Sequence, residues 1–200
     1  MTTTPTVYEN RPGHTHDVAR SQRLAVILLI CADASFVFGL IFTYFYLRGL
    51  NTNDGWIGAG DATVSPVWNW LIAAIVVASA LVYQWGERRG REGNHRSLVT
   101  GTSLGLLLVV ADLAVQIWRI LVSPGTVGND SYASITVTMG AAHVFHLLLT
   151  VFVGLAVWFR ARRGLTTGAA GQHATLVGYW WTWVAASAVL IALCTTFASP

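Results

Sequence analysis

Residues 136–159 read Thr-Val-Thr-Met-Gly-Ala-Ala-His-Val-Phe-His-Leu-Leu-Leu-Thr-Val-Phe-Val-Gly-Leu-Ala-Val-Trp-Phe, an apolar run interrupted by two histidines. An α-helix needs about 20 consecutive, mostly apolar residues to cross a hydrocarbon core about 30 Å thick. This run is long enough, and it contains no aspartate, glutamate, lysine or arginine. It therefore predicts a transmembrane helix.

Four further stretches of the chain have the same character. They occupy residues 24–48, 66–86, 98–122 and 176–197. The whole chain is 54% hydrophobic and only 10% charged, whereas a soluble globular domain carries roughly 25% charged residues. An open sheet would leave unpaired backbone groups in lipid, so the spans must be helical. The sequence predicts an all-α polytopic membrane protein with five transmembrane helices.

The predicted organisation is a single membrane domain with one tail. Residues 1–22 are polar and are expected to form a cytoplasmic tail, and residues 23–200 form the five-helix transmembrane domain. The connections between spans are short, which leaves no room for a separate soluble domain. Tyrosine and tryptophan gather near the expected span ends, including Trp180, Trp181 and Trp183, and this is typical of an interfacial aromatic belt.

The basic residues predict the orientation. All twelve are arginines, and ten of them precede the first span or lie between spans two and three or between spans four and five. By the positive-inside rule these segments are cytoplasmic, which places the N-terminus inside and the C-terminus outside in the cell inner (plasma) membrane. The other two, Arg48 and Arg119, lie at the outer tips of helices, where they are expected to contact another subunit or lipid headgroups. The net charge of +3 follows from this asymmetry and gives no support to nucleic-acid binding.

Four ionisable side chains lie at membrane depth, where such groups are costly and face protein or a water-filled path. They are Asp33, Asp112, His143 and His146. A helical rise of roughly 1.5 Å per residue places Asp33 at roughly 13 Å from the cytoplasmic end, Asp112 at roughly 21 Å, His146 at roughly 20 Å and His143 at roughly 24 Å. The depths predict that Asp112 meets the histidine pair, whereas Asp33 lies nearer the cytoplasm.

Three interpretations of the histidines compete, because residues at spacing i, i+3 share one helical face. They could ligate haem or a metal, handle protons, or form polar contacts between helices. A bis-histidine haem needs a second axial ligand, and no other histidine lies within a span. Polar contact, with Asp112 as a partner, is therefore favoured, and we expect no metal site. The sequence contains no arrangement of nucleophile, base and orienting group, so no catalytic centre is expected in the chain itself.

Two segments resemble one known family. Residues 31–48, Cys-Ala-Asp-Ala-Ser-Phe-Val-Phe-Gly-Leu-Ile-Phe-Thr-Tyr-Phe-Tyr-Leu-Arg, are similar to the Ser-Glu-x-Met-Phe-Phe-x-Gly-Leu-Phe-x-x-Tyr-Phe-x-x-Arg stretch of cytochrome c oxidase subunit III. The segment from Gly140 to Gly154, with its histidines three residues apart, resembles that family's Gly-x-His-x-x-His-x-x-x-Gly segment. The length and the five spans fit the family's short bacterial form.

The chain departs from the family pattern at three places. Asp33 stands where the family usually has glutamate, and the end of span three, residues 116–119, lacks the usual glutamate. The last span usually begins Tyr-Trp-His-Phe-Val-Asp, but residues 179–184 read Tyr-Trp-Trp-Thr-Trp-Val, without the histidine and the aspartate. These departures indicate a divergent branch, so a subunit of a quinol oxidase or nitric oxide reductase complex remains an alternative.

The resemblance implies an accessory subunit without a redox centre of its own. It would pack against the large haem–copper subunit, which holds the haem and copper, and against other oxidase subunits. There it would stabilise the catalytic subunit and support proton uptake in aerobic electron transport. Asp33 is the residue most directly carried over, followed by Arg48, His143 and His146, and the family's bound phospholipid is expected in a cleft.

Two alternatives belong to different classes of protein. An independent membrane b-type cytochrome would use His143 and His146 as haem ligands. A small transporter would need a polar path through the bundle, but spans two and five carry no such ionisable residue. The transporter is therefore the less favoured of the two.

Overall fold

The computed structural model describes residues 12–50, 56–57, 63–122, 130–165 and 169–197, and these ranges form five α-helices without a β-strand. The helices are α1 (Pro12–Gly49), α2 (Pro66–Arg91), α3 (His95–Val122), α4 (Ser131–Arg162) and α5 (Ala169–Phe197). Each is long and apolar enough to cross a membrane. The prediction of a five-helix polytopic membrane protein is thus confirmed.

The helices extend past the predicted spans, mainly at the arginine-rich end. α1 begins at Pro12, so residues 12–22, expected as part of a tail, are helical; residues 1–11 lie outside the described ranges. α5 begins at Ala169 rather than at residue 176. Hydropathy marks where a helix is apolar enough for lipid, whereas backbone hydrogen bonding continues through the polar turns that flank it.

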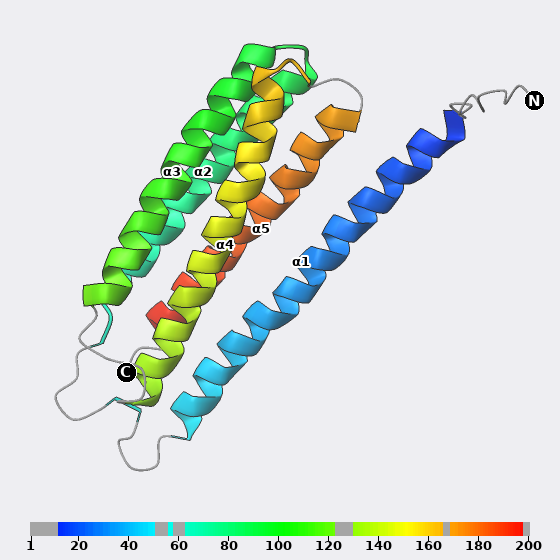
Figure 1. The fold of residues 1–200 in the computed structure, drawn as a ribbon. Coiled ribbons are helices and arrows are strands. Elements are labelled where there is room, and N and C mark those ends of the chain that lie inside the picture. The colour runs from blue at the N-terminus through cyan, green and yellow to red at the C-terminus, as the bar shows by residue number, and fades with distance from the viewer. Residues whose placement is uncertain (1–11, 51–55, 58–62, 123–129, 166–168, 198–200) are drawn as a thin grey trace, which may run out of the picture.

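Helices α2 to α5 form a bundle, and α1 packs only against α4 and α5 (Figure 1). α2 and α3 are antiparallel and lie very close, because glycines face each other at their contact. A Cβ atom added to Gly86 would lie 2.8 Å from the Cα atom of Gly101, so neither position accepts a side chain without displacement of a helix backbone. Small residues allow this close approach of membrane helices.

The centre of the bundle is organised by the tryptophans of α5. Trp181 is fully buried, stacks on Tyr83 with ring centroids 4.4 Å apart, and donates a hydrogen bond of 2.9 Å to Ser79. Trp180 is also buried, and its indole donates to Thr150. The expectation that Trp180, Trp181 and Trp183 form part of an interfacial belt is wrong, because α5 begins earlier than predicted and places them in its middle.

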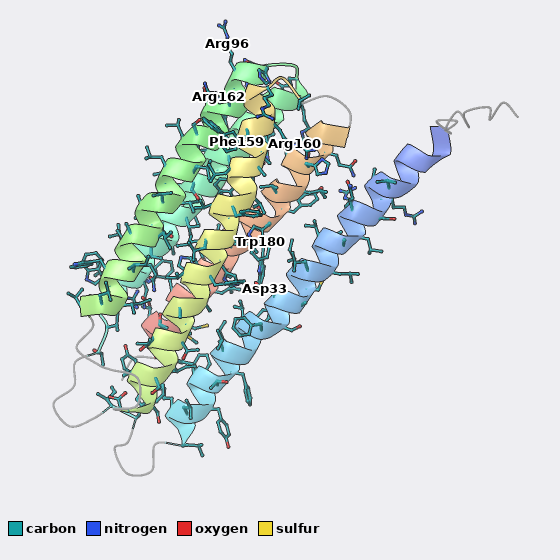
Figure 2. All side chains as sticks on the ribbon, in the orientation of Figure 1. Asp33, Arg96, Phe159, Arg160, Arg162 and Trp180 are labelled. Atoms are coloured by element: carbon teal, nitrogen blue, oxygen red, sulfur yellow. The ribbon has the colours of Figure 1, made fainter. Side chains whose placement is uncertain are left out.

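The arginine-rich turns lie together at one end of the molecule, where Figure 2 shows Arg96, Arg160 and Arg162. α2 continues to Arg91, past the predicted span end at residue 86, so residues 87–91 are helical. Glu87 is buried there, paired with Arg91 at 3.0 Å, and accepts a hydrogen bond of 2.6 Å from Thr175. We refer to this as the arginine-rich end and to the other as the opposite end.

Candidate functional site

Asp33 of α1 is held by two side chains from two other helices. Its Oδ1 atom lies 2.9 Å from Nε2 of His146 on α4, and its Oδ2 atom accepts a hydrogen bond of 2.6 Å from Nε1 of Trp183 on α5. The His146 side chain is 2% exposed and the Asp33 side chain 14%. We call these three residues the Asp33 cluster. It joins α1 to the bundle through both oxygens of one carboxylate.

The Asp33 cluster lies near the middle of the three spans that contribute to it, which are Val18–Gly49, Ser131–Arg162 and Gly171–Thr196. Asp33 lies level with His146, so the expectation that it lies nearer the cytoplasm is wrong for His146, whereas His143 lies one turn farther from the arginine-rich end. The depth of Asp33 was counted from residue 24, whereas the helix begins at Pro12 and leans away from the bundle at that end (Figure 1). Counting along a helix gives depth only when its start and tilt are known.

His146 is fixed on its other sides by packing. The ring of Trp180 lies edge-on to the imidazole, with centroids 5.8 Å apart. Trp180 in turn donates to Oγ1 of Thr150, whose hydroxyl donates to the backbone carbonyl of His146. This arrangement restricts the imidazole to the orientation in which Nε2 faces Asp33. Such support from neighbouring side chains keeps a polar contact in one geometry.

A second carboxylate–histidine contact lies one helical turn along α4. Nε2 of His143 is 3.2 Å from Oδ2 of Asp112 on α3, and we call these two residues the Asp112 pair. Asp112 is fully buried and His143 is 5% exposed. The predicted contact between Asp112 and the histidine pair is present, and it is made by His143.

The Asp112 pair differs from the Asp33 cluster in that it is incompletely hydrogen-bonded. Oδ1 of Asp112 and Nδ1 of His143 are buried and have no hydrogen-bond partner among the residues that the structure describes. Beside the pair, Gly140 makes room for Gln116, since an added Cβ atom would lie 2.6 Å from its Nε2. The arrangement places a polar amide between the pair and the opposite end of the bundle.

The two arginines at the helix tips have different surroundings. Arg119 is half-buried and donates a hydrogen bond to Asn69 of α2, whose amide donates to Thr195 of α5. Arg48 lies in the last turn of α1 and makes no hydrogen bond or ion pair with another described residue. Arg119 thus belongs to a polar contact inside the bundle.

Sequence reasoning missed two residues of this site. Trp183 was grouped with the interfacial tryptophans, although its indole nitrogen is bonded to Asp33. Gln116, only 2% exposed, was considered only as a departure from the family pattern. The signal for Gln116 was its spacing, because it is a polar side chain four residues after Asp112. The signal for Trp183 was its indole, whose N–H needs a partner wherever it is buried.

An apolar cavity of about 300 Å³ separates α1 from α4 and α5 on the arginine-rich side of the Asp33 cluster. Val26 and Leu29 of α1 line one wall, and Phe152 of α4 and Trp180 of α5 line the other. Arg160 also lines it, and Figure 2 labels Arg160 and Trp180. Its lining is apolar apart from Arg160 and His173.

In the described part of the chain, no three histidine, cysteine, aspartate or glutamate side chains come together as a metal-binding group. The Nε2 atoms of both intramembrane histidines are already directed at carboxylates. Both histidines thus form polar contacts between helices.

The fold and the site together define the class of protein. It is a polytopic membrane protein whose five described helices are linked by carboxylate–histidine contacts. A profile of the cytochrome c oxidase subunit III family matches residues 6–193. The chain belongs to the cytochrome c oxidase subunit III family.

Its curated relatives are distant. Over 149 residues, 72% of this chain, it is 22% identical to "Cytochrome c oxidase subunit 3" of Pisaster ochraceus and covers 57% of that protein. The protein of the same name from Patiria pectinifera is 22% identical over 68% of this chain and 54% of its own length. That from Lycodon semicarinatus is 20% identical over 84% of this chain and 66% of its own length. The chain thus spans between about half and two thirds of the relatives it matches.

Proposed function

We propose that the chain is a non-redox accessory subunit of a haem–copper respiratory terminal oxidase. It stabilises the catalytic large subunit and supports proton uptake, and the haem and copper lie in that partner. Membership of the cytochrome c oxidase subunit III family supports this proposal. The observation that supports a role for this chain's own residues in proton uptake is the Asp33 cluster. Its carboxylate belongs to α1, the helix that the rest of the chain covers least.

The chemistry of the Asp33 cluster suits a proton-holding group. An indole N–H can only donate, so Oδ2 of Asp33 must accept from Trp183. The remaining oxygen and Nε2 of His146 then share one proton, which either atom can hold. Because Trp183 fixes the carboxylate and Trp180 restricts the imidazole, a proton that arrives here changes the charge of the cluster without a large movement of side chains.

The exposed surface of α1 supports the position proposed for the partner. In its most apolar 18-residue window only 11% of residues are buried, compared with 33–50% in the other spans. Large apolar side chains point outward along it, among them Phe38, Phe42 and Phe45. We propose that the large subunit covers this face, which brings Asp33 close to the contact between subunits.

The apolar cavity between α1 and the bundle favours a second role, which is lipid binding. Its volume of about 300 Å³ and the guanidinium of Arg160 at its rim suit one acyl chain and the phosphate of a phospholipid. Such a lipid would fill the space that α1 leaves where it leans away. Mass spectrometry of the purified chain, with Phe152→Trp to fill the groove, tests whether phospholipid is retained there.

Copurification in mild detergent tests the main proposal. A tag on this chain is expected to bring down a large subunit with the absorbance of a haem–copper centre, and turnover with reduced cytochrome c, quinol or nitric oxide then assigns the complex. Haem absorbance in the chain purified alone, lost on replacing His143 and His146, would instead identify a b-type cytochrome. A chain that copurifies with no such subunit overturns the proposal.

The role of Asp33 is tested inside the assembled complex. Asp33→Asn keeps the shape and the acceptor for Trp183 but removes the ionisable group. It is expected to slow proton-coupled turnover or hasten its decay while haem content stays unchanged. Ser35→Ala on the exposed side of α1 is the matched control, since its hydroxyl bonds only within its own helix. Unchanged activity and lifetime in Asp33→Asn would remove Asp33 from the mechanism.

A further inference from the structure

A small polar cavity lies beside His143, between the Asp112 pair and the opposite end of the bundle. Its volume is about 40 Å³, and helices α2 to α5 all contribute to its walls. The polar part of its lining consists of Asn69, Gln116, Arg119, Thr136, His143 and Thr195. One enclosed water needs at least about 10–15 Å³ measured in this way and two to four polar partners, so the cavity has room for about three.

Two buried atoms of the Asp112 pair call for such water. Nδ1 of His143, which lines the cavity, and Oδ1 of Asp112 have no hydrogen-bond partner among the described residues. Buried polar atoms are nearly always bonded to protein or to ordered water. The imidazole therefore has one nitrogen directed at a carboxylate and the other without a described partner, and the His143 side chain lines a space of the size and polarity that water occupies.

Two further cavities continue from this one towards the opposite end. The next holds about 10 Å³ and shares Gln116, Arg119 and Thr136 with the first. The third holds about 260 Å³, shares Val64 and Arg119 with the second, and is lined by residues at the start of α2 and the end of α3. Arg119 lines all three cavities, and its guanidinium donates to Asn69, which lines the first.

We propose that water fills these cavities and connects the Asp112 pair to the opposite end of the bundle, so that the pair exchanges protons with that side of the membrane. Few charged groups face this path. α3 contributes Asp112 and Arg119, and α4 contributes His143 with His146 one turn away. The residues of α2 and α5 that line the inner cavity do not titrate. The positive charge of Arg119 would repel metal cations, which must move past it as whole ions. A proton can instead transfer from one water to the next.

This inference is independent of the oxidase assignment, because it concerns only the folded chain. Hydroxyl-radical footprinting detects water inside the cavities, because X-ray pulses generate radicals from single waters beside a side chain. Met139 is suited to this test: it is 3% exposed, it lines the inner cavity, and Met1 is the only other methionine. In the purified full-length chain, we expect Met139 to oxidise several-fold faster than fully buried Trp181, at a rate nearer that of exposed Trp85.

Two cavity-filling variants distinguish bound water from local opening. Ala188 and Ala192 of α5 both line the inner cavity, and Ala188→Val or Ala192→Val is expected to slow oxidation of Met139 several-fold. Ala185→Val adds the same volume one turn away, at a core position outside this cavity, and should leave that oxidation unchanged. Thermal unfolding of each variant identifies any that fails to fold. If one filling variant fails, the other distinguishes bound water from local opening.

The route to the surface is tested by rapid mixing into ¹⁸O-labelled water before the pulse. The label is expected to enter the Met139 sulfoxide, and Val64→Phe, which narrows both outer cavities, should delay it several-fold. Val67→Phe, on the exposed face of α2, is the matched control and should leave the delay unchanged. Slow oxidation of Met139, like that of Trp181, would mean a dry cavity and overturn the proposal. Entry of label unaffected by Val64→Phe would overturn the route.

Discussion

The Asp33 cluster and the Asp112 pair use the same two side-chain types one turn apart on α4, yet their surroundings differ. Both carboxylate oxygens of Asp33 have a partner, whereas Asp112 and His143 each keep one buried atom without a partner among the described residues. The first joins a peripheral helix to the bundle, and the second lies inside it beside a cavity. Identical residue types thus give a contact bonded on both carboxylate oxygens at one site and, by the water path proposed above, a contact completed by water at the other.

The difference between the two sites follows from how α1 and α3 are held in the bundle. Among the helices, α1 packs against α4 and α5 alone, and few polar contacts between described residues hold it there. Apart from the Asp33 cluster, Arg23 donates to Tyr179 at 2.8 Å, and Gln172 donates to the carbonyl of Ala19 at 2.7 Å. In lipid no hydrophobic effect drives helices together, so packing and hydrogen bonds carry their association. α3 is packed between α2 and α4 in any case, so its aspartate is not needed to hold it.

The largest effect is therefore expected for Asp33→Ala, which leaves the buried His146 and the partly buried Trp183 without their hydrogen-bond partner. Interhelical hydrogen bonds in membranes contribute about 0.6 kcal/mol on average and up to about 1.7 kcal/mol each. Asp33→Ala should lower the free energy of unfolding by about 2 kcal/mol. Asp112→Ala should cost about 1 kcal/mol, because only His143 loses a partner and cavity water can replace it.

Unfolding in mixed micelles, followed by tryptophan fluorescence, measures both values. Thr43→Ala on α1 is the control, because its hydroxyl bonds only to the carbonyl of Gly39 in the same helix. If Asp112→Ala proved as destabilising as Asp33→Ala, the distinction between a direct contact and a water-dependent one would be lost.

A smaller effect is expected for Trp183→Phe, which removes one donor to Asp33 and keeps the apolar ring. The loss should be about 1 kcal/mol, roughly half that of Asp33→Ala. Residues in one hydrogen-bonded network do not contribute additively. The double variant of Asp33→Ala with Trp183→Phe should therefore be no less stable than Asp33→Ala alone. Additive losses would indicate that Trp183 stabilises the fold through packing and that its bond to Asp33 contributes little.

The fold could be predicted almost completely from the sequence, because lipid requires about 20 apolar residues per helical span. The predicted start of α2 at Pro66, after Ser65, agrees with the structure because a proline at the first helical position has no N–H to leave unpaired. The starts of α1 and α5 were missed since polar turns outside the lipid carry no hydropathy signal. That error moved Asp33 and the three tryptophans of α5 to the wrong depth.

The residues of the site could be predicted more easily than their pairing. Ionisable residues in apolar spans stand out, and Asp33, Asp112, His143 and His146 were all identified. Which aspartate meets which histidine depends on helix rotation and tilt, and these are set by side-chain packing across α3, α4 and α5. The bond from Trp183 to Asp33 and the cavity beside His143 are likewise products of packing, which no pattern along one chain contains.

The smallest effect on stability is expected for Gly140→Ala, which tests the surroundings of the Asp112 pair. The new methyl would lie 2.6 Å from Nε2 of Gln116, so this flexible amide must turn towards the cavity. Replacing a helical glycine by alanine contributes about 0.5–1 kcal/mol, and this gain offsets the displacement. The net change in unfolding free energy should stay within about 0.5 kcal/mol of zero.

Footprinting should nevertheless respond to Gly140→Ala, because the displaced amide of Gln116 occupies part of the water volume and slows oxidation of Met139. Gly39→Ala on α1 is the matched control: nothing lies within 4 Å of its added methyl, so it should stabilise the helix slightly and leave Met139 unaffected. Unchanged oxidation in Gly140→Ala would show that the amide turns away from the cavity. A large loss of stability would show that turning the Gln116 amide does not make enough room for the methyl group, and that α3 and α4 are held rigidly at this contact.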